Sequence, residues 1–391
     1  MDTITPTIAS EPRFRTVDRE APRPHQWTPL LVPCASIDEA SARLQVEDGA
    51  VCRAVEIVHP QNPEPEPSLA PGFPVSVNLL NLGQEVTISR VEFCIRGSGQ
   101  VIAGGRTLSP TKFDIWDIPS ILRRRYCCDG REAFVWLSYS NAPLLQKLGI
   151  HYSDEGNIQR ARPKSEREAA ESKYARQRAP DIAILATGTC LCSYEFLTDI
   201  EVVENKPLIW PWCLVSPHVS MQPGDEKRTI MLCYKPAMKR RNGTTHSFFA
   251  TVTSWLAGNV RPVPARGHKH SSLSCNYHFR GRRSSIVDGQ RFGWEDGDLM
   301  LSAPSWSEHA HGSSIEGPTV LTVQDYSFQI GTECLVWQER IDGPVLTIGS
   351  EAGQKGYVGP WLKGEQLQAC ITAVARKSPS EVARGPLWTA R

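Results

Sequence analysis

The sequence from Gly267 to Gly312 reads GHKHSSLSCNYHFRGRRSSIVDGQRFGWEDGDLMLSAPSWSEHAHG and holds five of the ten histidines of this 391-residue chain. Four of them form two His-x-His pairs, His268 with His270 and His309 with His311. Successive side chains of a strand point to opposite faces, so both members of a pair point to the same side. This clustering predicts a metal site.

The segment between the two pairs carries the signals of short antiparallel strands. A β-prone run covers 275–279, and the turns Asp288-Gly289 and Gly297-Asp298 separate the runs that follow. These signals predict a small barrel whose strands bring the two pairs together. Three imidazoles on one face, with open positions for water and substrate, suit a divalent transition metal.

A weaker copy of this segment lies earlier in the chain. Ile95–Arg106 aligns with Phe279–Gln290, and the same offset places Gly83 over Gly267, which predicts two copies of one barrel. The first copy has other residues at the metal positions, and none of them replaces a neutral imidazole ligand: Gln84, Val86, Arg124 and Tyr126. We therefore expect the first barrel to be free of metal.

Composition excludes several classes of function. The formal net charge of +1 gives no reason to expect nucleic acid or a membrane as a partner. The 12 cysteines show no paired zinc spacing, and no apolar run approaches the ~20 residues of a membrane span. With no signal-peptide core, we expect a cytoplasmic protein with reduced thiols.

The pattern predicts an all-β-dominated fold of two tandem barrels joined by short helices, one of them near residues 36–43. The expected units are a flexible N-terminal arm, a first barrel lacking metal ligands, a charged linker with a helix, a second barrel with the metal site, and a C-terminal tail. Their ranges are 1–26, 27–155, 156–204, 205–350 and 351–391.

The order H-x-H, Y-H-x-x-G, D-G-x-x-F-x-W-x-x-G-D and P-S-W-x-x-H-x-H resembles the cupin motif of gentisate 1,2-dioxygenases and related salicylate and hydroxynaphthoate ring-cleaving enzymes. The resemblance covers about residues 27–345. It implies two cupin (double-stranded β-helix, jelly-roll) barrels, a homodimer or homotetramer, and an Fe(II) site on three histidines. Carried over by position, the ligands are His268, His270 and His309, and His311 faces the substrate.

Three departures from the family pattern bear on the substrate. The family usually holds its iron in the first cupin, whereas here only the second keeps its ligands. Asn276 stands where the family has an arginine that holds a substrate carboxylate, and Asp325 alone replaces a pair of aspartates. An amide can bond a hydroxyl but cannot compensate a buried carboxylate. We therefore expect a phenol or quinol-like substrate that lacks an essential carboxylate.

These observations predict a non-heme Fe(II) cupin dioxygenase that acts on a hydroxylated aromatic compound and O2, in secondary metabolism. His311 would move a proton, with Asn276 and Asp325 beside the reacting groups. His278 is expected to be a satisfied core histidine. Three histidines also suit Zn or another divalent metal, so an isomerase, cyclase or hydrolase remains an alternative, as does a cupin that only binds a small molecule.

Overall fold

The computed structural model describes the two barrels and most of their connections. The described residues are 27–46, 53–62, 68–70, 72–81, 85–86, 91–119, 122, 124–128, 130–141, 144, 182–183, 190–191, 206–220, 228–238, 243–258 and 260–347. The predicted N-terminal arm, the C-terminal tail, Gln84 and nearly all of the charged linker, its helix included, lie outside the described residues. No helix in the described part is long and apolar enough to cross a membrane.

The first barrel consists of a six-stranded sheet, in the order β13-β8-β5-β10-β3-β2, and a four-stranded sheet, in the order β4-β9-β6-β7. Its strands are β2 (Arg53–Glu56), β3 (Val75–Leu80), β4 (Glu85–Val86), β5 (Val91–Arg96), β6 (Gln100–Ala103), β7 (Arg106–Leu108), β8 (Ile115–Asp117), β9 (Arg124–Cys127), β10 (Phe134–Tyr139) and β13 (Leu208–Trp210).

The second barrel repeats this plan with a six-stranded sheet, β1-β20-β17-β22-β15-β14, and a three-stranded sheet, β19-β18-β21. Its strands are β1 (Leu30–Val32), β14 (Arg228–Leu232), β15 (Phe249–Trp255), β17 (Ser274–Arg280), β18 (Arg283–Val287), β19 (Gln290–Trp294), β20 (Leu299–Ala303), β21 (His309–His311) and β22 (Thr319–Gln324). A further small sheet joins β16 (Lys269–His270), β23 (Val336–Gln338) and β24 (Leu346–Thr347).

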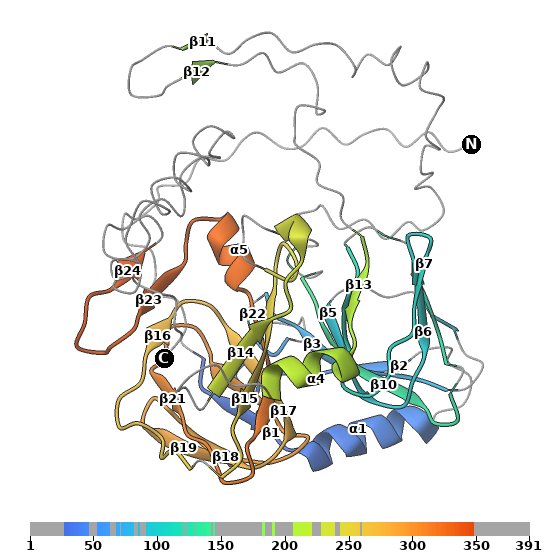
Figure 1. Cartoon of the computed structure of the whole chain (residues 1–391), viewed down its shortest axis with the longest axis horizontal. Coiled ribbons are helices and arrows are strands. Elements are labelled where there is room, and N and C mark those ends of the chain that lie inside the picture. The colour runs from blue at the N-terminus through green and yellow to red at the C-terminus, as the bar shows by residue number, and fades with distance from the viewer. Residues whose placement is uncertain are drawn as a thin grey trace, which may run out of the picture.

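Short helices and one separate hairpin complete the described structure. The helices are α1 (Cys34–Val46), α4 (Trp212–Ser220), α5 (Tyr326–Gly331) and the 3-10 turn η3 (Pro236–Met238), and the hairpin pairs β11 (Ile182–Ala183) with β12 (Cys190–Leu191). The helix expected near residues 36–43 is confirmed as part of α1. Figure 1 shows the barrels side by side, the first in cyan and green and the second in yellow and orange.

The pairing of the strands confirms the repeat and the tandem-barrel fold. β5 pairs with β8 and β10 just as β17 pairs with β20 and β22, and β6 pairs with β7 and β9 just as β18 pairs with β19 and β21. The predicted turn between β18 and β19 is also confirmed, because Asp288 and Gly289 both have positive φ, at 46° and 82°. Positive φ at two successive residues is the conformation of a tight hairpin turn.

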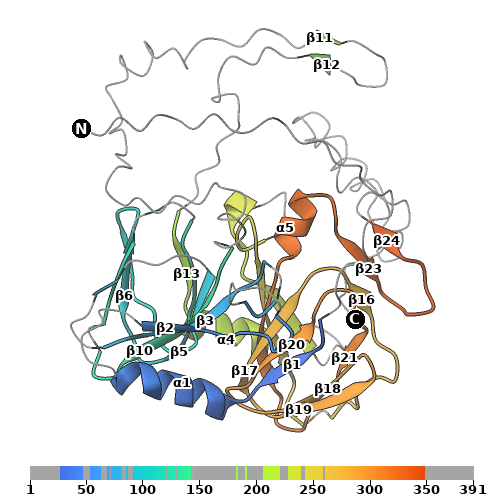
Figure 2. The same cartoon turned by 180° about the vertical axis from the view of Figure 1, so that it is seen from behind.

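The two barrels exchange one edge strand each. β1, at the start of the described chain, pairs antiparallel with β20 of the second barrel, with Leu30 opposite Leu301 (Figure 2). β13, which follows the predicted linker, pairs with β8 of the first barrel. The backbone N–H of Cys34 also donates to Asp298 Oδ1 at 2.8 Å. The predicted boundaries at 155 and 205 stay a prediction, but neither six-stranded sheet is built from one continuous segment.

An apolar core joins the six-stranded sheets of the two barrels. The ring of Phe93 on β5 lies 5.2 Å from that of Tyr277 and 5.5 Å from that of Phe279, both on β17. Phe73 and Phe248 meet edge to face at 5.5 Å. Aromatic side chains bury large apolar areas in such contacts. The interface between the two barrels is therefore part of one continuous hydrophobic core.

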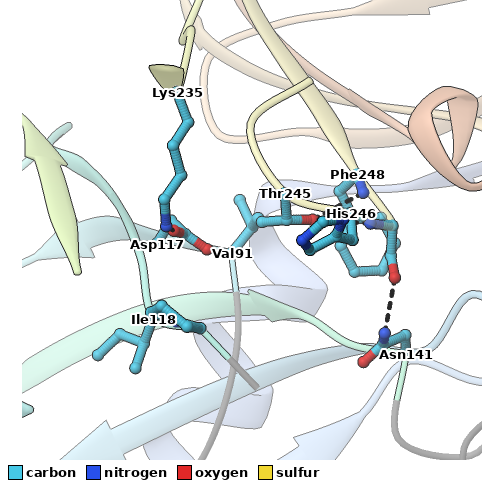
Figure 3. A pocket seen from close by; sticks show the side chains of 10 residues that line it. Val91, Asp117, Ile118, Asn141, Lys235, Thr245, His246 and Phe248 are labelled. Carbon is cyan, nitrogen blue, oxygen red and sulfur yellow. Dashed lines mark hydrogen bonds and ion pairs between the residues drawn. The ribbon is translucent and has the colours of Figure 1, made fainter. Parts of the chain in front are cut away.

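One buried ion pair crosses this interface. The ammonium group of Lys235, just before η3, contacts the carboxylate of Asp117 on β8, and their side chains are only 3% and 1% exposed. The pair lies beside a cavity that also contains His246 and the hydrogen bond from Asn141 to Ser247, which is 2.6 Å long (Figure 3). None of the residues that line this cavity belongs to the His268–His311 segment.

The interior of the first barrel holds a buried carboxyl group, that of Glu92. Glu92 is fully buried and accepts hydrogen bonds from the Tyr126 hydroxyl at 2.7 Å and the Trp136 indole at 3.3 Å. Burial raises the pKa of Glu92 to about 8, although these bonds and the charge of Arg124 oppose the shift. Tyr126, which stands at the position of His311 in the first barrel, therefore donates a hydrogen bond to Glu92. The prediction that this barrel binds no metal stays a prediction.

The raised pKa of Glu92 predicts a dependence of stability on pH. The folded state keeps this proton up to about pH 8, whereas the unfolded state releases it near 4.5, the ordinary pKa of a glutamate. The free energy of unfolding should therefore fall as pH rises between these values. Glu92→Gln, which keeps the shape without the charge, should flatten that part of the profile in urea unfolding measured from pH 5 to 8. An unchanged slope would contradict this prediction.

Candidate metal centre

Three histidines of the second barrel meet at one point. His268 and His309 pair across an antiparallel bridge, with backbone N–H to carbonyl distances of 3.1 and 3.0 Å. The ring centroid of His309 lies 4.2 Å from that of His268 and 4.6 Å from that of His270. The nitrogens of these three rings that could act as ligands all lie within 4.8 Å of one another. The structure thus brings together the three residues expected to be ligands.

A glycine makes this close approach of backbones possible. A Cβ on Gly267 would overlap the carbonyl group of His309, so no other residue fits without moving that strand. The N–H of Gly267 donates to Glu308 Oε1 at 2.9 Å, which ties together the residues that precede the two histidines. Gly267 and Glu308 therefore fix the separation of His268 from His309.

The orientation of two rings suits metal binding. His270 Nδ1 lies 2.8 Å from the carbonyl oxygen of Ser272, and His309 Nδ1 lies 2.9 Å from that of Ser307. A carbonyl oxygen can only accept, so each Nδ1 carries the ring proton and each Nε2 keeps its lone pair. Such carbonyl partners fix the tautomer of histidine ligands in metalloproteins.

The surroundings keep all three imidazoles neutral. Burial, followed by the effect of His309, lowers the pKa of His270 to about 3. Burial also lowers the pKa of His268, with further contributions from His309, His270 and Arg228, and it lowers that of His309. A histidine must be unprotonated to bind a metal, so neutral rings at ordinary pH make a ready ligand set.

His311 lies beside the three histidines but does not belong to the converging set. Its ring centroid is 5.6 Å from that of His309, and its Nδ1 lies 2.8 Å from Ser285 Oγ on the paired strand β18. The Trp294 indole donates to the same oxygen at 3.0 Å. The Ser285 proton is then free to point at Nδ1, which places the proton of the His311 ring on Nε2.

Two residues of β17 face the interior of the second barrel, on the side opposite Tyr277. Asn276 donates to Ser302 Oγ at 2.8 Å, and its Oδ1 is buried with no hydrogen-bond partner among the described residues. His278 is buried and stacks on Trp294 at 3.2 Å between centroids, as expected of a core residue. The expectation that it is satisfied is wrong, because neither ring nitrogen has a partner in the described structure.

Asp325 supports the chain near the site. Its Oδ1 accepts from the backbone N–H of Leu273 at 2.7 Å and its Oδ2 from Gln329 at 3.1 Å, while burial raises its pKa to about 6. Both oxygens are therefore engaged three residues beyond His270. Through its contact with Leu273, Asp325 positions the loop that follows β16. A catalytic role for Asp325, as for His311 and Asn276, stays a prediction.

Sequence reasoning assigned no role to Arg283, Ser285 and Trp294. Arg283 is buried, its guanidinium donates to the carbonyl oxygen of Gly312, and its central carbon lies 3.4 Å from the centroid of the Trp255 ring. Alternation along β18 offers the one available signal, since Arg283, Ser285 and Val287 share a face. That signal does not tell which face is interior.

Solved structures of salicylate 1,2-dioxygenases resemble this one. A salicylate 1,2-dioxygenase from Pseudaminobacter salicylatoxidans superimposes with a TM-score of 0.62 at 11% identity, over 81% of this chain and 89% of that one. The same type of enzyme with bound gentisate gives 0.60 at 11% identity, over 84% and 87%. No family model and no curated protein sequence matches. At this identity the likeness concerns the fold alone, and the fold of the chain is that of a tandem cupin.

Proposed function

We propose that this protein is a metal-dependent cupin oxygenase that acts on a hydroxylated aromatic compound. The observation that carries the proposal is the convergence of three neutral imidazoles, from His268, His270 and His309. Two of them hold their protons on carbonyl-bonded Nδ1 atoms, so Nε2 lone pairs are free for a metal. No carboxylate belongs to this cluster.

Iron(II) is the metal that we favour. One structural neighbour is a dioxygenase that was solved with gentisate, an aromatic acid, and its fold covers most of this chain. Bound to three histidines, iron(II) would supply a single centre at which an electron-rich ring and dioxygen can react. Zinc also accepts three histidines and would then support non-oxidative chemistry such as isomerisation, cyclisation or hydrolysis.

The residues around the triad suit a phenolic substrate. His311 is neutral, because burial and then the charge of Arg283 lower its pKa, and its Nε2 proton can be exchanged with a substrate hydroxyl. The unpartnered Oδ1 of Asn276 can accept a hydrogen bond from such a hydroxyl. An amide at this position gives no charge to hold a carboxylate beside the metal, which supports a phenol or quinol there. A homodimer or homotetramer and a cytoplasmic location also stay proposals.

Metal content together with oxygen uptake tests the proposal. Protein purified without air should hold about one iron per chain and consume O2 with at least one member of a panel of phenols and quinols. His268→Ala should lose both the metal and the uptake. His218→Ala is the matched control, because His218 is an exposed histidine of α4. Bound zinc without any oxygen uptake would favour the non-oxidative alternative, and no metal at all would favour a binding protein.

A further inference from the structure

The second barrel contains a buried positive charge that has no counter-ion. Arg283 is 8% exposed, and its Nε donates to the Gly312 carbonyl. No carboxylate forms an ion pair with it in the described part of the chain, and its two terminal amino groups have no hydrogen-bond partner there. Its guanidinium lies between aromatic rings instead, 3.4 Å from the centroid of Trp255 and 5.6 Å from that of Trp294.

The other charge that acts on Arg283 makes its burial less favourable. Burial and then the positive charge of Arg228 lower the pKa of the Arg283 guanidinium, and no acidic group opposes them. A buried charge without a partner is strongly unfavourable, and stacking on tryptophan offsets only part of that cost. A bound anion would supply the negative charge that Arg283 lacks in the described part of the chain.

A neighbouring side chain also lacks partners. Both ring nitrogens of His278 are buried without hydrogen bonds in the described structure, and His278 stacks on the same Trp294 that flanks Arg283. Buried polar atoms nearly always have a partner in proteins, and a ligand beside Arg283 would give one to the His278 ring. A guanidinium with two free amino groups matches the two oxygens of a carboxylate.

The position of Arg283 sets how far this group lies from the metal centre. β18 pairs with β21 so that Val287 faces His309 and Ser285 faces His311. Arg283 lies four residues from Val287, which is about 13 Å along a strand at ~3.3 Å per residue. The guanidinium itself bonds the carbonyl of Gly312, the residue after His311, so we expect a carboxylate held there to lie beyond His311 rather than at the three converging histidines.

We infer that the second barrel binds, through Arg283, a carboxylate that its aromatic substrate carries at the end away from the metal-binding hydroxyl groups. The inference rests on the proposed function for the metal end of the substrate. It replaces the expectation of a substrate without an essential carboxylate, because Asn276 argues against that charge only beside the histidines. The substrate class is then a phenol or quinol whose carboxylate is separated from its hydroxyls by the ring or by a side chain.

Binding to the unaltered protein gives the first test. Calorimetry should compare dihydroxyphenylpropanoate with its carboxamide, which has the same shape without the charge, and with salicylate, whose carboxylate adjoins its hydroxyl. The propanoate should bind about 10- to 100-fold more tightly than the amide, the range of a charge-assisted pair of hydrogen bonds. Equal affinities for acid and amide, or a preference for salicylate, would overturn the inference.

Two variants assign the effect to the guanidinium. Arg283→Gln should remove the preference for acid over amide, while Arg283→Lys should keep part of it, because the charge remains without the two-pronged geometry. Arg291→Gln is the matched control, since Arg291 is an exposed arginine of the adjacent strand β19. A preference that survives in Arg283→Gln would refute the assignment, and if that variant does not fold, the lysine variant and the unaltered protein decide.

This test separates the inference from the proposed function. Calorimetry measures binding without turnover, so a clear preference for the acid stands even if no oxygen is consumed. In that case the anion site would hold and the oxygenase proposal would fail. Oxygen uptake on phenols with no preference for the acid would show the opposite.

Discussion

Replacing His309 with alanine is expected to empty the metal centre. Its ring is buried and lies closest to both partners, at 4.2 and 4.6 Å between centroids, so no two remaining ligands can compensate for its loss. Substitution of residues that only hydrogen-bond to a metal ligand lowers metal affinity or activity by about 10- to 100-fold. The effect of removing a ligand itself should exceed that range. Metal analysis should find background levels, and oxygen uptake should fall by more than about 100-fold.

His311→Ala gives the matching comparison for this experiment. Its ring contacts Ser285 rather than the converging nitrogens, so the variant should keep its metal and lose rate. If His309→Ala kept a full complement of metal, the three-histidine centre would be wrong. If His311→Ala lost the metal instead, His311 would have to be counted as a ligand.

Replacing Lys235 with methionine is expected to destabilise the protein by about 3–5 kcal/mol, the usual cost of removing one partner of a buried pair. The change leaves the Asp117 carboxylate buried between the barrels without its ion-pair partner. Burial raises the pKa of Asp117 to about 6, and the positive charge of Lys235 is the largest effect that opposes this rise. Without the lysine this pKa rises further. The folded state then holds a proton that the unfolded state releases near 3.8, so the loss should be smaller in acid than at pH 8.

A double variant separates the lost charge from lost packing. Asp117→Asn with Lys235→Met removes both charges, and it should recover most of the stability because no lone charge stays buried. Urea titrations give the free energies of unfolding of the original protein, of Lys235→Met and of the double variant. A single variant within about 1 kcal/mol of the original protein would show that water reaches this carboxylate.

Local signals in the sequence explain what could be predicted. The tight turn at Asp288-Gly289 and the alternation along each His-x-His pair depend on neighbours only a few residues away. The structure contains the turn, brings His268 and His270 to one point, and pairs His309 and His311 with alternate residues of β18. The repeat was readable because glycines mark the same turns in both copies. The spacing of the two pairs predicted that they meet, and the resemblance to the cupin motif supplied the choice of His268, His270 and His309 as the three ligands.

Contacts between distant segments explain what could not be predicted. Whether Arg283 faces solvent or the interior depends on how β18 lies against β21 and on the position of Trp255, about thirty residues away in the chain. Nothing near Leu30 indicates that it pairs with Leu301. The unpartnered nitrogens of His278 were missed for the same reason, since satisfaction of a buried ring is decided by residues on other strands.

The exchange of β1 and β13 has a consequence for the order in which the molecule can be assembled during synthesis. When β1 leaves the ribosome, its partner β20 is still unmade, and the sheet of the first barrel stays one strand short until β13 appears. Contacts of such long sequence separation make folding slow. The nascent chain must therefore hold one unpaired strand, β1, and one open sheet edge, at β8, until its second half arrives. The two halves of the protein then mature together, and its early intermediates need protection from aggregation.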